Sequence, residues 1–207
     1  MKADQNDIYY IMGNDERSAV HSPHLDVIRA YGYEVLLMTD PLDAFMLVRL
    51  KEYQDHPLTN VAAADLTMPS EEQEAKEGED STQPAEIYTD LIERFKTQLG
   101  DQVTDVRMTD RLADSPARLV DAEGALDQEI QYVYRYLDKD FEIPKKSLEL
   151  NPRHPIIKQL NELPEDSKLS PLIITQIFED ALLIEGLHPD PAGMITRIQE
   201  LMEAALK

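Results

Sequence analysis

The chain has 207 residues, no cysteine, and 41 acidic against 20 basic residues, which gives a formal net charge of −21. The lack of cysteine excludes disulfides and thiolate zinc sites, and the acidic balance disfavours binding to nucleic acid or to anionic membranes. No apolar run approaches the roughly 20 residues of a membrane span, and the first residues contain no signal-peptide core, so we expect a cytoplasmic protein with no membrane partner.

The first 64 residues alternate between strand-like and helix-like segments. Residues 7–12 (DIYYIM) are rich in β-forming residues. Residues 33–38 (YEVLLM) are an uninterrupted apolar run, typical of a strand covered on both faces. Between these strands, Ser22-Pro23 begins a helix that Gly32 ends.

A second helix is expected to begin at Asp40-Pro41, and residues 58–63 are expected to form a last short strand. Strands that alternate with helices favour parallel pairing, because a helix carries the chain back to the start of the next strand. The sequence therefore predicts a small α/β unit with a parallel sheet over residues 1–64.

Residues 65–84 (DLTMPSEEQEAKEGEDSTQP) differ in character from the rest of the chain, because acidic side chains dominate and Lys76 is the only basic residue among them. Such a run cannot bury enough apolar surface to offset the entropy lost on ordering. We therefore interpret residues 65–83 as a flexible linker. An acidic tract that binds a partner is the alternative.

Residues 84–207 are predicted to form an α+β domain. Its first helix covers residues 84–99, carries Ile87, Leu91, Phe95 and Leu99 on its apolar face, and ends at Gly100. Two strands are expected around a turn at residues 114–116, and a third strand follows a helix. The expected strands are 103–109, 117–120 and 147–150, and the expected helices are 121–137 and 155–163.

The last 39 or so residues, from 169 to 207, are predicted to form a hairpin of two antiparallel helices. Ser170-Pro171 begins the first helix, Gly186 ends it, and Asp190-Pro191 begins the second.

The hairpin carries more apolar surface than one core face needs. Either both faces pack on the chain's own core, or one face meets a second copy in an intermolecular four-helix bundle. We expect the second arrangement, a homodimer, and the residues assigned to its interface are Ile174, Ile177, Phe178, Ala181, Leu182, Met194, Ile195, Ile198, Leu201, Met202 and Ala205.

The helix predicted over residues 121–137, with Asp121 as its cap, carries a single apolar stripe. The stripe consists of Leu126, Ile130, Val133, Tyr134 and Leu137. Periodicity alone favours packing of this stripe into the domain core.

The sequence shows no catalytic constellation, glycine-rich phosphate loop or serine elbow. His21 and His24 have the spacing of metal ligands, but Pro23 lies between them and no third ligand is near in sequence, so we interpret them as caps or solvated groups. We expect no catalytic, cofactor-binding or metal-binding residue in this chain.

Three blocks, in this order, resemble the heat-shock protein 90 family of bacterial type. Residues 22–45 (SPHLDVIRAYGYEVLLMTDPLDAF) resemble the end of its middle domain. Residues 106–120 (VRMTDRLADSPARLV) and 148–160 (LELNPRHPIIKQL) resemble its C-terminal domain, and the closing hairpin resembles its dimerisation helices.

The resemblance implies the C-terminal part of an ATP-dependent chaperone. ATP and magnesium would bind outside this chain, which would itself dimerise and bind non-native client proteins. By the same resemblance, Leu126, Ile130, Val133, Tyr134 and Leu137 would face a cleft between protomers, with Phe45 on its wall.

Two features depart from the family pattern. Phe45 stands where bacterial relatives often have a client-contacting tryptophan, which weakens a client role there. The C-terminus, MEAALK, lacks the acidic pentapeptide that docks tetratricopeptide co-chaperones, so we expect no such partner.

A small α/β enzyme domain fused to an acidic dimerisation module is the alternative function. The turns Gly13-Asn14 and Thr39-Asp40 at the expected strand ends disfavour it, because they lack a phosphate-binding or nucleophile pattern.

Overall fold

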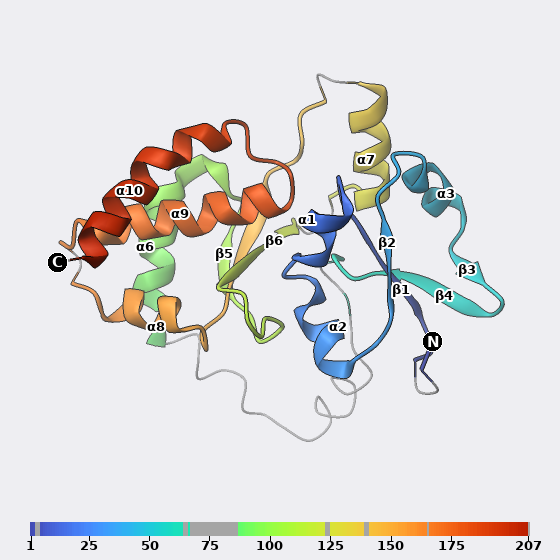
Figure 1. Cartoon of the computed structure of the whole chain (residues 1–207), viewed down its shortest axis with the longest axis horizontal. Helices are drawn as coiled ribbons and strands as arrows, with labels where there is room; N and C mark the ends of the chain where they lie inside the picture. The colour runs from blue at the N-terminus through green and yellow to red at the C-terminus, as the bar shows by residue number, and fades with distance from the viewer. Residues whose placement is uncertain are drawn as a thin grey trace.

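The computed structural model describes residues 1–2, 5–63, 66, 87–122, 125–138, 141–164 and 166–206. Two small sheets, each with its own helices and core, form an N-terminal unit and a C-terminal unit that pack side by side (Figure 1). The linker predicted over residues 65–83 lies outside the described residues except for Leu66, which is buried in the N-terminal core.

The N-terminal sheet has the strand order β2-β1-β4-β3. Its strands are β1 (Ile8–Met12), β2 (Val35–Met38), β3 (Glu52–Tyr53) and β4 (His56–Asn60). The central strand β1 pairs in parallel with β2 and with β4, which confirms the predicted parallel sheet.

The sequence analysis missed β3, which forms an antiparallel hairpin with β4. The turn between them places Gln54 and Asp55 at positive φ, 50° and 65°. Two-residue hairpin turns require this conformation and usually have glycine or asparagine there, so the sequence carried only a weak signal.

Helices cover the two faces of this sheet because side chains alternate along β1. Tyr9 and Ile11 pack with α1 (Glu16–Val20) and α2 (Leu25–Tyr31) on one face. Tyr10 and Met12 pack with α3 (Asp43–Arg49) on the other. The expectation that β2 is covered on both faces is wrong, since β2 lies at the sheet edge and Leu36 is 47% exposed.

The C-terminal sheet contains β5 (Val106–Met108), β6 (Ala117–Asp121) and β7 (Lys146–Leu150), in the order β5-β7-β6. The strand β7 is buried along its whole length, parallel to β5 and antiparallel to β6. The two strands predicted around the turn at residues 114–116 therefore exist but do not pair with each other, because β7 inserts between them.

Helices α6 (Thr89–Leu99) and α8 (Pro155–Glu162) pack on this sheet as predicted, and the 3₁₀ turn η1 (Gly100–Gln102) follows α6. The apolar face of α6 consists of Leu91, Phe95 and Leu99, each almost fully buried. Ile87 does not belong to this face, since it is 68% exposed.

The closing hairpin consists of α9 (Leu169–Ile184), the 3₁₀ turn η2 (Pro191–Gly193) and α10 (Met194–Ala205). Gly186 has φ 65° just after α9, as expected of a helix stop. Ser170 is not the cap of α9 but lies buried in its first turn, where its Oγ accepts a hydrogen bond from Arg94 Nη1 at 3.4 Å.

Helix α7 (Gln128–Leu137) begins later than predicted. Asp121 is the last residue of β6 and does not cap the helix, since its carboxylate forms an ion pair with Lys146 at 2.6 Å and accepts a hydrogen bond from Gln131.

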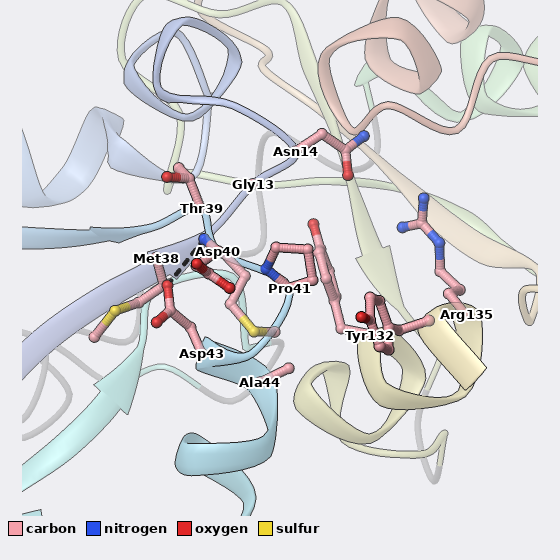
Figure 2. Close-up of a pocket in the computed structure, with 12 residues that line it drawn as sticks. Gly13, Asn14, Met38, Thr39, Asp40, Pro41, Asp43, Ala44, Tyr132 and Arg135 are labelled. Carbon is pink, nitrogen blue, oxygen red and sulfur yellow. Dashed lines mark hydrogen bonds between the residues drawn. The ribbon is translucent and has the colours of Figure 1, made fainter.

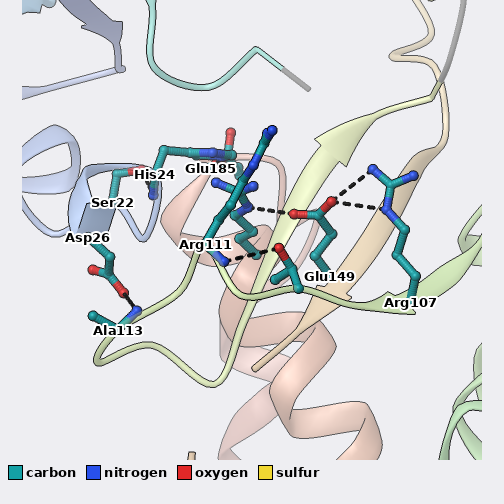
Figure 3. A network of polar contacts seen from close by, with 10 residues as sticks. Ser22, His24, Asp26, Arg107, Arg111, Ala113, Glu149 and Glu185 are labelled. Atoms are coloured by element: carbon teal, nitrogen blue, oxygen red, sulfur yellow. Dashed lines mark hydrogen bonds and ion pairs between the residues drawn. The ribbon is translucent and has the colours of Figure 1, made fainter. Parts of the chain in front are cut away.

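Polar contacts between described residues join the units, and two of them involve α2 and the residue just before it. His24 Nε2 lies 3.0 Å from Glu185 Oε1, at the end of α9. Asp26 Oδ2 accepts hydrogen bonds from the backbone nitrogens of residues 113–115. Figure 3 shows His24 beside Glu185, Asp26 beside Ala113, and next to them Glu149 bound to the guanidinium group of Arg107. Glu149 also binds the guanidinium group of Arg118.

Candidate functional site

The candidate site lies where α7, from the C-terminal unit, packs on α3 and β1 of the N-terminal unit (Figure 1). Tyr132 and Val133 pack against the apolar cluster formed by Tyr10, Met12, Ala44 and Leu47. Further out, the ring of Tyr136 meets that of Phe45 edge to face, with centroids 5.9 Å apart and an interplanar angle of 88°. This geometry is favourable for aromatic pairs and fixes the outer end of the contact.

A buried carboxylate holds the inner side of α7 in place. Glu129 is only 5% exposed, and its Oε1 accepts a hydrogen bond from the Tyr10 hydroxyl at 2.5 Å and one from Asn60 Nδ2 at 2.8 Å. Asn60 also donates to Gln128 Oε1 at 2.9 Å. Burial is the largest cause that raises the pKa of Tyr10, and the hydrogen bond to Glu129 is the next largest. The phenol of Tyr10 therefore remains protonated, and a hydrogen-bond donor, at any physiological pH.

The predicted apolar stripe of α7 is divided between two surroundings. Val133 faces the N-terminal unit, and Ile130 is half-buried. Leu126, Tyr134 and Leu137 are exposed by 47%, 46% and 68%. The expectation from periodicity, that the stripe packs into the core, is therefore wrong for these three residues, because α7 docks through the face that carries Glu129 and Tyr132.

Exposed apolar side chains on α3 extend this region across the junction between the units. Phe45 is 37% exposed, and with Tyr136 it joins the two helices. We call the exposed apolar side chains of these two helices and their starts the α3/α7 surface; they are Leu42, Phe45, Met46, Leu126, Tyr134, Tyr136 and Leu137. Phe45 and Tyr136 contact each other, whereas Tyr134 lies on the opposite side of α7, where it stacks on Phe141.

Leu42, Met46 and Tyr136 were not predicted as site residues. For the first two the sequence offers a signal, because Leu42 lies three residues before Phe45 and four before Met46, a spacing that puts Leu42 beside both on a helix. Tyr136 could not be found from the sequence, since its contact with Phe45 depends on how α7 docks.

A pocket of about 210 Å³ opens beside this surface (Figure 2). Residues from the ends of β1 and β2, the start of α3 and one side of α7 line it. Tyr136 belongs both to the pocket and to the α3/α7 surface.

The residues assigned to a dimer interface fall into two groups. Ile174, Ile177, Phe178, Ala181 and Met194 are at most 5% exposed, and the first four belong to the core of their own chain, where Leu182 also packs. They therefore present no free surface. On α10, Ile198 and Leu201 are half-buried and Ala205 is exposed. Ile195 and Met202 are 55% and 61% exposed.

The described residues contain no group of three or more His, Asp or Glu side chains placed to hold a metal ion. His21 Nδ1 lies 2.8 Å from the Arg17 carbonyl oxygen, and His24 contacts Glu185, so the two histidines have separate structural partners. None of the described helices is long and apolar enough to span a membrane.

The exposed apolar side chains of α3 and α7 thus lie beside the buried polar contact that seats α7. Over residues 1–207 the chain matches the family model described as "Hsp90 protein", and it belongs to that family, in agreement with the resemblance in its sequence.

The similar curated proteins carry the name "Chaperone protein HtpG". The chain is 33% identical over 208 residues to that of Chlorobium phaeovibrioides, a match that covers 99% of this chain and 33% of the relative. It is 36% identical over 203 residues to that of Cupriavidus taiwanensis, covering 98% of this chain and 32% of the relative. The chain thus spans about a third of the length of the curated relatives it matches.

Proposed function

We propose that this chain is the client-binding and dimerisation part of a cytoplasmic, ATP-dependent chaperone that assists protein folding under stress. Membership of the Hsp90 family supports this general role. The observation that carries the client-binding assignment is the seating of α7 by Glu129, which leaves Leu126, Tyr134 and Leu137 in solvent.

Client binding suits the chemistry of the α3/α7 surface. A non-native protein exposes apolar segments of many sequences, and a wide apolar patch can bind each of them weakly. Aromatic side chains supply large contact area, and Phe45 and Tyr136 contact each other on this surface, with Tyr134 exposed on the other side of α7. Two copies in a dimer would strengthen binding by presenting two patches to one client.

Dimerisation through α10 is the second part of the proposal. Ile195 and Met202 are exposed on one side of this helix, and a second copy of the hairpin would remove them from water. We propose that ATP and magnesium bind in segments of the longer relatives that this chain does not match.

Replacing Leu126 and Leu137 together with serine tests the client surface. Both side chains are largely exposed, so the melting temperature should stay within a few degrees of that of the unchanged protein. The suppression of aggregation of a thermally unfolded model enzyme should fall, because the double change removes apolar contact area from the surface.

Leu183→Ser is the matched control, since Leu183 is 45% exposed and lies on α9, outside the α3/α7 surface as defined. It should leave aggregation suppression unchanged. The assignment would be contradicted if the control lost as much aggregation suppression as the double variant. It would also be contradicted if suppression fell only in proportion to a loss of stability.

A further inference from the structure

The pocket beside the α3/α7 surface lies at the carboxyl edge of a parallel sheet. Gly13 and Asn14 directly follow β1, and Thr39 and Asp40 directly follow β2. From these neighbouring strands the chain continues to opposite faces of the sheet, since α1 and α2 cover one face and α3 covers the other. Crevices of this kind are where open α/β sheets bind ligands.

The size of the pocket limits what can enter it. Pockets that hold a whole small molecule usually measure about 300–1,000 Å³. The volume here is about 210 Å³, with Tyr132 and Tyr136 of α7 on one side. It therefore suits a single side chain better than a complete cofactor or metabolite.

Two carboxylates mark one end of the pocket, and both keep an oxygen for a ligand. Asp40 Oδ1 accepts a hydrogen bond from the Leu42 backbone at 2.8 Å, and Asp43 Oδ2 accepts one from the Asp40 backbone at 3.1 Å. The second oxygen of each carboxylate has no protein partner among the described residues. Figure 2 shows both aspartates on the same side of Pro41.

Among the described residues that line the pocket, Arg135 is the one with a basic side chain. Its guanidinium stacks over the Tyr132 ring, 5.2 Å from the centroid. In the view of Figure 2 it lies on the far side of Tyr132 from the two aspartates. The end of the pocket that carries the two aspartates therefore favours a positively charged group.

The aromatic side chains shared with the neighbouring patch connect the pocket to the bound client. Tyr136 lines the pocket and contacts Phe45, and Leu42 follows Pro41 directly. A peptide segment that contacts Phe45 and Tyr136 would therefore lie beside the pocket.

We propose that this pocket receives a lysine or arginine side chain of a client segment whose apolar residues lie on the α3/α7 surface. The proposal rests on the client-binding function proposed above. The two carboxylates would bind the cationic group, and the tyrosine rings would pack along its aliphatic stem. The net charge of −21 would also attract basic client segments from solution.

Three labelled peptides that differ at one central position test this inference. Each carries the same flanking apolar residues, and the central residue is lysine, methionine or glutamate. Fluorescence anisotropy should show that the lysine peptide binds up to about fivefold more tightly than the methionine peptide, and the glutamate peptide most weakly. The lysine preference should shrink at high salt.

The double variant Asp40→Asn, Asp43→Asn should abolish the lysine preference and leave the affinity for the methionine peptide unchanged. Asparagine keeps the side-chain oxygen that accepts the backbone hydrogen bonds, so the start of α3 stays intact. Glu52→Gln with Asp55→Asn is the matched control, because it removes two exposed negative charges on β3 and its turn. This control should retain the preference.

These outcomes distinguish the pocket proposal from the proposed client-binding function. The pocket proposal would be overturned if all three peptides bound the unchanged protein equally well. The client-binding function would still stand if that binding were lost in the double variant Leu126→Ser, Leu137→Ser. Tightest binding of the glutamate peptide would also overturn the pocket proposal, since Arg135 would then dominate. A lysine preference lost equally in the control would show that only net charge acts, and would overturn it as well.

Discussion

Oδ2 of Asp26, on α2 of the N-terminal unit, lies 3.1 Å from the backbone nitrogen of Ser115, in the loop that leads into β6 of the C-terminal unit. The same oxygen accepts hydrogen bonds from the backbone nitrogens of Ala113 at 3.2 Å and Asp114 at 3.1 Å. Asp26 is only 6% exposed, so three donors converge on one buried carboxylate oxygen across the junction between the units.

Replacing Asp26 with alanine should loosen this junction. Hydrogen bonds to a charged group each contribute about 1.5–3 kcal/mol, and the backbone donors of the loop would lose their acceptor. We expect the free energy of unfolding in urea to fall by about 2–3 kcal/mol. Asp114→Ala is the control, because that exposed side chain makes none of these bonds, and a similar loss there would contradict the role of Asp26.

Gly186 should not tolerate alanine, because its φ of 65° costs a residue with a Cβ about 1–2 kcal/mol. The new Cβ would also meet the end of the Asn14 side chain, but Asn14 is exposed and flexible and can move aside. Gly186→Ala should therefore lower the free energy of unfolding in urea by about the conformational cost alone. A double-mutant cycle with Asn14→Ala measures the contribution of Asn14, and a large recovery of stability in the double variant would contradict this.

Helix ends could be predicted from the sequence because their signals are local. Gly32, Gly100 and Gly186 were each expected to end a helix, and all three have positive φ at the ends of α2, α6 and α9. A left-handed residue is strained unless it is glycine, so one residue type reports the backbone conformation directly.

Contacts between distant segments could not be predicted in this way. The insertion of β7 between β5 and β6 depends on pairing that no local pattern encodes. The orientation of α7 depends on the bond between Tyr10 and Glu129, which are 119 residues apart in sequence. For α9, the pattern could not separate a core face from a partner face, and Ile174 and Phe178 proved to lie in the chain's own core.

Dimerisation should depend on the exposed side chains of α10. Ile195→Asp with Met202→Asp places charges where a second copy would bury them, which costs several kcal/mol per unpaired charge in a dimer. Both positions are exposed in the single chain, so its fold should be unaffected. Light scattering at micromolar concentration should show a dimer for the unchanged protein and a folded monomer for the variant.

Two results would contradict the proposed dimer interface. One is a stable monomer for the unchanged protein, and the other is a dimer that survives both charges. Glu203→Lys is the control for charge alone, since Glu203 is exposed on the same helix.

Acid stability should depend on Arg107 through Glu149. Burial opposes ionisation of Glu149, but Arg118 and Arg107 outweigh it and hold the pKa of this carboxyl below its usual range. The resulting stabilisation is present above the pKa of glutamate in the unfolded chain, about 4.3, and is lost as the pH falls toward the lower folded value.

Arg107→Gln should therefore raise the pKa of Glu149 and move acid unfolding to a higher pH. Arg107 is half exposed, so the fold should persist at neutral pH with a loss of about 1 kcal/mol. Circular dichroism across an acid titration measures the midpoint. Arg49→Gln removes the same charge from an exposed position on α3, and an equal shift of midpoint there would contradict the specific role of Arg107.

ATP should not bind to this chain. We propose no residue in it as a phosphate or magnesium ligand, and the cavity at the carboxyl edge of the N-terminal sheet carries two aspartates, which repel phosphate. Isothermal titration with ATP and magnesium should therefore give only heats of dilution. Saturable binding at micromolar concentration would contradict the proposed location of the nucleotide site.

The bond between Tyr10 and Glu129 should control how firmly α7 is seated. Tyr10→Phe removes the donor at 2.5 Å and leaves the buried carboxylate with Asn60 alone. A hydrogen bond to a charged acceptor is worth about 1.5–3 kcal/mol, so local opening of α7 should increase about tenfold or more. Hydrogen exchange of the amides of residues 131–137 measures this opening.

Tyr9→Phe provides the matched control on the same strand. Tyr9 is equally buried, but it faces the opposite side of the sheet, where its ring stacks on Tyr33 at 5.9 Å. Tyr9→Phe should leave hydrogen exchange in α7 unchanged. Tyr10→Phe should also weaken client binding, because the exposed apolar residues of α7 lose their fixed orientation. Equal exchange in the two variants would mean that apolar packing of Tyr132 and Val133 seats α7 without the buried carboxylate.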